Sequence, residues 1–204
     1  RFLADEEWQI CHHNVIVDNN VMQAFIDCRI ADRFVYCSSS MVFQNGKSPC
    51  IEEHADRVQI PPPTNNYGFF KLAGERLAQM LCSKYERECV IGRPFNVYGP
   101  GELSKLEEEY GVSHVIPDFH RKIRLLKEGK ADVMDVFGDG QQSRSFTWVE
   151  DTANAFALMC IDPDVAGETF NIASEENITM TELAYTISRM LDYPIDITYR
   201  APWA

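Results

Sequence analysis

Two short apolar segments with one long amphipathic segment between them constrain the fold more than any other feature of the chain. The first runs from Arg33 to Cys37 and the second is Cys89-Val90-Ile91, and both have the length and composition of buried strands. Between them, a helix that Thr64 or Asn66 can cap runs to about Tyr85. A strand, a helix and a strand of these lengths favour parallel pairing through a crossover, so the sequence predicts an α/β fold.

The same patterns predict the other elements. Apolar residues at helical spacing favour a helix over residues 14–30, and Pro117 suits the first turn of a helix that ends at Gly129. Gly138-Asp139-Gly140 indicates a hairpin or tight turn after residues 133–137. The last three expected elements are a helix capped by Asp151, a strand at Thr169–Ile172, and a final helix with a capping box formed by Thr179 and Glu182.

Composition and charge limit the class of protein. The 204 residues are 45% hydrophobic and 25% charged, as in ordinary globular proteins. The net charge of −12 disfavours nucleic acid and anionic membranes as partners, so a phosphate-bearing ligand needs local arginines, for which Arg93 and Arg144 are candidates. No apolar run approaches the roughly 20 residues that cross a bilayer. Seven cysteines without C-x-x-C spacing favour a reducing compartment, and we expect a cytoplasmic protein without a metal site.

A tyrosine and a lysine four residues apart, Tyr67 and Lys71, lie on one face of the predicted helix. At about 5 Å and an effective dielectric of about 20, the ammonium favours the phenolate by roughly 3 kcal/mol, so we expect a lowered pKa for Tyr67. Ser38, Ser39 and Ser40 follow the preceding strand, and a serine hydroxyl there can meet both side chains. Such a set can take a proton from a sugar hydroxyl during hydride transfer, although the same spacing also occurs on helices that merely expose both side chains.

Several motifs in a fixed order strengthen the first interpretation. They are Asn14-Val15 with Asn20 to Ala24, Phe34 to Ser40, Tyr67 to Glu75, Arg93 to Pro100, and Val136 to Gly140 with Arg144 to Thr147 and Val149 to Asp151. On these motifs the chain resembles the extended short-chain dehydrogenase/reductase superfamily, in its NAD-dependent nucleotide-sugar epimerase/dehydratase branch. The resemblance implies a partial doubly wound Rossmann-type parallel sheet with the catalytic residues over 1–100. It also implies a small C-terminal domain, mainly substrate-binding, over 101–204.

The resemblance further implies roles for the matching residues. Tyr67 is the general base or acid, Lys71 holds the cofactor ribose and tunes the phenol, and Asn14 steadies a water or the lysine. Ser39 is the catalytic serine, with Ser40 as the close alternative. For the cofactor, the resemblance implies NAD rather than NADP, held by Ser38, Tyr67 and Lys71. For the substrate it implies contacts from Ser40 and Met41, from Asn96 and Arg144 to the diphosphate, and from Phe137 to the base. Three of these residues also have a purely structural alternative. Asn96 would satisfy the backbone of its loop, Arg144 would form a surface ion pair, and Phe137 would belong to a core.

Three positions depart from the family pattern. Met41 stands where the family's dehydratases place an acidic residue, so a 4,6-dehydratase is not expected. Phe70 replaces the small residue usual before the lysine, and Asp18 replaces the threonine of the asparagine helix. The packing around both positions should therefore differ from that of the family.

The implied function is an NAD-dependent nucleotide-sugar epimerase, acting at the sugar 4-position, in a homodimer; a reductase or decarboxylase of the same family is an alternative. The sequence contains no glycine-rich strand-to-helix turn for the pyrophosphate of NAD. Residues 1–4 resemble the end of the family's fourth strand, so we expect the chain to be part of a longer enzyme. The other alternative is a short, non-catalytic sugar-nucleotide-binding or scaffold module whose sheet edge another subunit covers.

Overall fold

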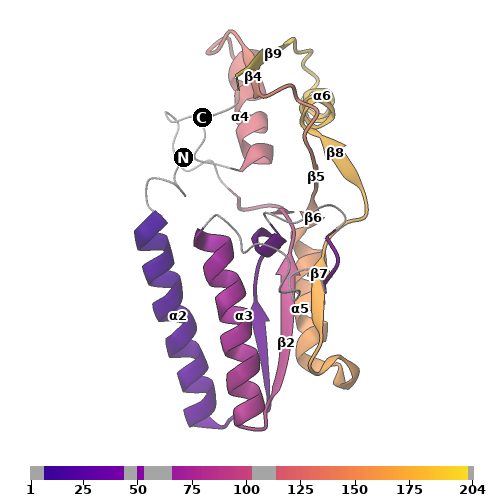
Figure 1. Cartoon of the computed structure of the whole chain (residues 1–204). Helices are drawn as coiled ribbons and strands as arrows, with labels where there is room; N and C mark the ends of the chain where they lie inside the picture. Colours follow the sequence, from indigo (N-terminus) through magenta and orange to yellow (C-terminus); the bar gives the residue numbers. More distant parts are fainter. Residues whose placement is uncertain (1–6, 44–49, 53–65, 103–113, 202–204) are drawn as a thin grey trace. The chain divides into compact units, whose positions relative to one another are not determined.

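The computed structural model describes residues 7–43, 50–52, 66–102 and 114–201 (Figure 1). The chain divides into two compact units. The sheet unit joins residues 2–97 with 147–173, and the helix-pair unit joins 98–146 with 174–204. Residues 1–4 and Thr64, which carried expectations above, lie outside the described part of the chain.

A three-stranded parallel sheet forms the centre of the sheet unit. Its strands are β1 (Arg33–Cys37), β2 (Glu88–Pro94) and β7 (Thr169–Ile172), in the spatial order β1-β2-β7. Val35 lies opposite Val90, and Ile91 lies opposite Thr169. The predicted strands and their parallel pairing are therefore confirmed, and the fold is α/β.

Helices cover both faces of this sheet because alternate residues of β2 point to opposite sides. Cys89 and Ile91 pack with Met22 and Ala78, which belong to α2 (Glu7–Cys28) and α3 (Asn66–Lys84). Val90 packs instead with Met159 of α5 (Val149–Ile161). Figure 1 shows α2 and α3 side by side on one side of the sheet and α5 on the other.

Short segments complete the sheet unit, and two predicted helix starts are wrong. The segments are the 3₁₀ helices η1 (Ser40–Phe43) and η3 (Pro163–Val165), and the short strands β3 (Val97–Tyr98) and β6 (Thr147–Trp148), of which β3 ends one residue into the helix-pair unit. The helix expected over residues 14–30 is α2, which begins seven residues earlier at Glu7 and ends at Cys28. Asp151 does not cap α5, because the N-cap residue is Trp148 and Asp151 lies within the first turn. A carboxylate at that position still interacts favourably with the positive end of the helix dipole.

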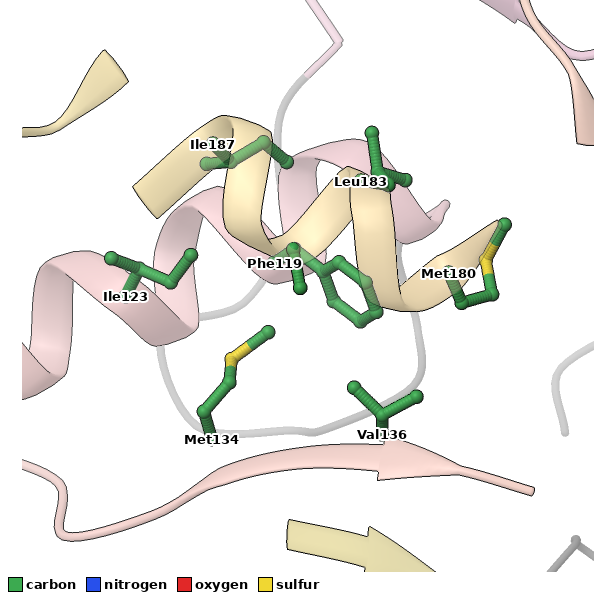
Figure 2. Close-up of a cluster of buried hydrophobic side chains, with 8 residues drawn as sticks. Phe119, Ile123, Met134, Val136, Met180, Leu183 and Ile187 are labelled. Carbon is green, nitrogen blue, oxygen red and sulfur yellow. The ribbon is translucent and has the colours of Figure 1, made fainter. Parts of the chain in front are cut away.

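The helix-pair unit is built around two helices that pack on a strand. Its elements are α4 (Val115–Lys127), β4 (Met134–Phe137), β5 (Ser143–Ser145), β8 (Asn177–Thr179), α6 (Met180–Met190) and β9 (Ile197–Arg200). Figure 2 shows how Phe119 and Ile123 of α4 meet Leu183 and Ile187 of α6 above β4. These apolar side chains are buried and form the core of the unit.

Two local sequence signals in this unit, the capping box before α6 and the glycine turn after β4, can be compared with the structure. The predicted capping box is confirmed, since the Thr179 hydroxyl accepts from the Glu182 N–H and the Glu182 carboxylate accepts from the Thr179 N–H. The glycine turn forms after β4, but β4 and β5 do not pair into a hairpin. Instead β4 runs parallel to β9, and β5 runs antiparallel to β8. Gly140, at φ +72°, lies so close to Thr181 that a Cβ would be 2.2 Å from its hydroxyl.

Candidate active site

The start of α3 and the end of β1 bring Tyr67 and Lys71 together. Lys71 Nζ donates to the Cys37 carbonyl at 3.0 Å, so its side chain reaches the carboxyl end of β1. The same ammonium lies 6.0 Å from the centroid of the Tyr67 ring and 5.2 Å from that of Tyr36. Both distances are in the range of cation–π attraction. The predicted proximity of Tyr67 and Lys71 is thus present in the fold.

The electrostatic environment of Tyr67 differs from the expectation. Burial raises the pKa of Tyr67, because the phenolate loses hydration, and the Asp18 carboxylate and the ionised form of Cys37 act in the same direction. A hydrogen bond between the side chains of Ser39 and Tyr67 opposes this shift without overcoming it. The expected lowering of the pKa by Lys71 is wrong for this structure: the ammonium bonds the Cys37 carbonyl and lies 6.0 Å from the Tyr67 ring centroid, and the net shift of the Tyr67 pKa is upward.

The three serines occupy different environments. Ser38 is buried, and its hydroxyl donates to the buried carboxylate of Glu75. That hydroxyl therefore faces the interior, and its expected role in holding the cofactor is not supported by the geometry. Ser39 is half-buried, bonds Tyr67 and accepts the backbone N–H of Met41 at 3.2 Å, whereas Ser40 begins η1. Ser39 is the serine that the structure joins to Tyr67.

A buried ion pair lies directly behind these groups. Arg93 donates through Nε to Glu75 Oε1 at 2.8 Å and through Nη2 to Oε2 at 2.6 Å, and both residues are excluded from solvent. Two parallel bonds of this kind are the strongest geometry for an arginine and a carboxylate. The suggestion that Arg93 holds a phosphate is therefore wrong, because its guanidinium is buried against Glu75.

Helix α2 contributes one predicted and one unpredicted residue. The Asn14 side chain donates to the Ile10 carbonyl at 2.7 Å, one turn earlier in the same helix. Its role toward a water or Lys71 stays a prediction. Asp18 was noted only as a departure from the family, yet its Oδ2 accepts the Tyr36 hydroxyl at 2.7 Å. The pKa of Tyr36 is raised by burial and by this carboxylate.

Asn96 occupies a strained position after β2. Its φ of 34° lies in the left-handed region, which asparagine tolerates better than most residues. The Asn96 carbonyl accepts the Thr147 N–H at 3.3 Å, and the side chain is exposed. An exposed amide on a fixed backbone is suited to a ligand contact, which remains the prediction for this residue.

The helix-pair unit contains the other two substrate candidates. Phe137 is half-buried at the end of β4, and Arg144 is exposed on β5, where its guanidinium bonds the Ser143 carbonyl at 2.8 Å. Lys122, which was not predicted from the sequence, is a buried lysine that pairs with Asp118 at 2.8 Å and lies 5.8 Å from the Phe137 ring centroid. Its spacing of four residues from Asp118 on a helix was the available signal.

Two general features of the described residues bear on ligands. No group of three or more histidine, cysteine, aspartate or glutamate side chains in this part of the chain could hold a metal ion. Among the helices that the structure describes, none combines the length and the apolar character needed to cross a bilayer.

The model of the NAD dependent epimerase/dehydratase family matches residues 4–173. The chain belongs to this family. The match covers both strands that flank α3 and includes Tyr67, Lys71 and Ser39. Membership in a family of NAD-dependent enzymes that act on nucleotide sugars agrees with the tyrosine, lysine and serine that meet at the sheet.

Individual relatives are distant in sequence but cover most of the chain. A GDP-L-fucose synthase of Sinorhizobium fredii is 26% identical over 92% of this chain and 58% of its own length. The structure of a UDP-N-acetylglucosamine 4-epimerase from Methanobrevibacter ruminantium, in complex with UDP-N-acetylmuramic acid, superposes with a TM-score of 0.80 at 26% identity, over 98% of this chain and 60% of that one. A UDP-glucuronic acid 4-epimerase from Bacillus cereus, in complex with NAD, gives a TM-score of 0.70 at 26% identity, over 93% and 56%. This chain thus spans between half and two thirds of the length of these relatives.

Proposed function

We propose that this chain carries the catalytic tyrosine and substrate-binding residues of an NAD-dependent nucleotide-sugar epimerase that acts at the sugar 4-position. The observation that carries the proposal is the meeting of Tyr67, Lys71 and Ser39 at the carboxyl end of β1 in a member of this family. Ligands of parallel α/β sheets bind at the carboxyl ends of the strands. In this proposal the sheet unit is part of a doubly wound Rossmann-type sheet and the helix-pair unit is a small substrate-binding domain.

The groups at this end of the sheet fit the nicotinamide ribose of NAD. Lys71 is a cation with N–H donors beyond the one bonded to Cys37, and such donors suit ribose hydroxyls. The sequence offers no glycine-rich turn for the pyrophosphate. We therefore place the pyrophosphate site in a segment outside these 204 residues, in agreement with the greater length of the relatives.

The chain's own residues then divide the proton transfer between them. Tyr67 accepts the proton of the sugar 4-hydroxyl, and Ser39 donates a hydrogen bond to the same oxygen as its charge changes. Hydride transfer from and back to the sugar carbon is the chemistry that NAD would supply when bound, and the positive charge of its oxidised ring would favour the Tyr67 phenolate. Burial keeps Tyr67 protonated at neutral pH in this structure, which is the form that returns a proton to the sugar ketone.

The helix-pair unit supplies groups suited to the nucleotide end of the substrate. Arg144 has an exposed guanidinium, which can bind a diphosphate through two parallel hydrogen bonds. The half-buried Phe137 ring can contact a base, and Lys122 lies beside that ring. The relatives named above act on both UDP- and GDP-sugars, so the proposal includes both bases.

A reductase of the same family is the second candidate. The observation that keeps a second reaction open is that the relatives are not all named epimerases, since a GDP-L-fucose synthase matches 92% of this chain. A reductase would convert a keto sugar with net consumption of a reduced cofactor, whereas an epimerase recycles its NAD. Absorbance of the nicotinamide during turnover distinguishes the two reactions, because only the reductase depletes the reduced form.

The test compares two lysine–tyrosine pairs, one at the start of α3 and one at its end. In a protein that includes the segment with the pyrophosphate site, Tyr67→Phe is expected to lower turnover of a UDP- or GDP-hexose by 10²- to 10⁴-fold, since the phenol is the proton-transfer group, while calorimetric binding of the nucleotide sugar is kept. Lys84 and Tyr85, at the end of α3, make a similar ring contact at 5.3 Å and provide matched controls in Lys84→Met and Tyr85→Phe. Equal loss in the control and the Tyr67 variant would contradict the assignment. Binding of the sugar nucleotide without any binding of NAD, in a protein that includes that segment, would favour the non-catalytic module.

A further inference from the structure

A second tyrosine shares the ammonium of Lys71. The Tyr36 ring centroid is 5.2 Å from Lys71 Nζ, closer than the Tyr67 ring at 6.0 Å. Tyr36 is almost fully buried on β1, and its hydroxyl donates to Asp18 on α2 at 2.7 Å. Three elements, α2, β1 and α3, therefore meet at one side chain beside the candidate catalytic pair.

A glycine on α3 makes room for this arrangement. A Cβ at Gly74 would lie 2.1 Å from the Tyr36 hydroxyl oxygen and 3.0 Å from Asp18 Oδ2. Real Cβ atoms do not approach neighbours at the first of these distances, so the hydroxyl and the carboxylate occupy a notch that only glycine leaves open. Gly74 follows Lys71 by three residues, which places the notch on the same face of the helix as the lysine.

We propose that Asp18 and Tyr36 are a positioning pair that holds the Lys71 ammonium beside Tyr67 and supplies the negative charge that balances it. A phenol that donates to a carboxylate gains electron density, and its ring then attracts a cation more strongly. The catalytic meaning of the pair rests on the proposed function, whereas its geometry and charge can be tested without turnover. Neither residue needs to touch the substrate.

The charged and titratable groups around Tyr67 come from every element packed against it. Lys71 lies on its own helix, Cys37 on β1 and Asp18 on α2, and Ser39 supplies a hydrogen bond. The Asp18 charge raises the pKa of both Tyr67 and Cys37, because a nearby anion disfavours ionisation of either group. Removing that charge while keeping the shape of the side chain should therefore lower the pKa of both.

Two reporters make this measurable in the 204-residue chain without cofactor. Difluorotyrosine placed at position 67 reports ionisation of that phenol by fluorine NMR, in a range of pH where the protein stays folded. The rate of alkylation of Cys37 by iodoacetamide, followed by peptide mass spectrometry against pH, reports its thiolate. Asp18→Asn keeps a hydrogen-bond acceptor for Tyr36 and removes the charge. Asp27→Asn on the same helix is the matched control.

We expect Asp18→Asn to lower both titration midpoints by about half a pH unit or more, Asp18→Glu to leave them near the wild-type values, and Asp27→Asn to change neither. If Asp18→Asn does not fold, Asp18→Thr is the second uncharged variant, since the family resemblance places threonine there. Unchanged midpoints in a folded uncharged variant overturn the proposal. A merely structural pair would lower stability and leave the midpoints in place. Absence of turnover in a wild-type protein that includes the segment with the pyrophosphate site would contradict the proposed function without affecting this result.

Discussion

Among individual residues, Arg93 joins three segments of the sheet unit. Its guanidinium pairs with Glu75 of α3, stacks 5.2 Å from the Phe43 ring of η1, and donates to the Glu52 carbonyl at 2.8 Å. Ser38 bonds the same Glu75 carboxylate from the end of β1. The orientation of α3, and with it the placement of Tyr67 and Lys71, is therefore tied to the sheet by a buried charge network.

Removal of one partner of this pair should be costly. We expect Glu75→Ala to lower the free energy of unfolding by about 3–5 kcal/mol, because it leaves the Arg93 charge buried without its carboxylate. Urea unfolding followed by circular dichroism measures the change. Asp32→Ala is the control, since Asp32 pairs with Arg87 at the surface and should cost at most about 1 kcal/mol. A loss for Glu75→Ala as small as the control would show that the pair is not a strong constraint.

Sequence patterns identify candidate residues of the site and of its surroundings, but they do not reveal which residues contact one another across different elements. The spacing of Tyr67 and Lys71 predicts their proximity, because both lie on one helix. The pairing of Glu75 with Arg93, and of Asp18 with Tyr36, joins different elements, and nothing local marks it. Burial is also absent from the spacing argument, which explains why the direction of the pKa change of Tyr67 was predicted wrongly.

At the scale of elements, most signals within a few residues predict well, although the local cap signal at Asp151 does not, and signals that need a distant partner predict poorly. The capping box of α6 and the strands β1, β2 and β7 follow from local sequence. The glycine turn after β4 is also local, but the hairpin was wrong because β4 takes β9 as its partner. Which strand pairs with which depends on burial and loop closure across the whole unit.

The contact between α3 and β1 at Gly74 gives a prediction about an element interface. Gly74→Ala should lower the free energy of unfolding by about 1–2 kcal/mol, although alanine favours a helix by up to about 1 kcal/mol over glycine, because its Cβ overlaps the Tyr36 hydroxyl. Chemical denaturation measures the loss. The double variant with Tyr36→Phe should recover part of it, since the nearest clashing atom is gone. A more stable Gly74→Ala protein would mean that the notch is looser than the structure shows.

At the scale of the whole molecule, two units with separate cores share one chain, and the chain returns to the sheet unit for α5 and β7. The sheet unit carries the candidate proton-transfer groups, and the helix-pair unit carries Phe137, Arg144 and Lys122. The solved UDP-N-acetylglucosamine 4-epimerase is matched over 98% of this chain, a stretch that includes both units.

The outer faces of α2 and α3 lead to a prediction about assembly. Val17 and Val21, one turn apart on α2, are 57% and 51% exposed, and Met80 on α3 is 59% exposed. Apolar side chains on two adjacent helices favour burial against a second copy of the same face, as the resemblance to the family implies. We expect light scattering after gel filtration to give twice the mass of 23.4 kDa.

Val21→Glu should shift the protein toward monomer because it places two carboxylates in the shared face, whereas Leu158→Glu, a similarly exposed position on α5, should not. A monomeric wild type, or equal dissociation in both variants, would exclude this face as the interface.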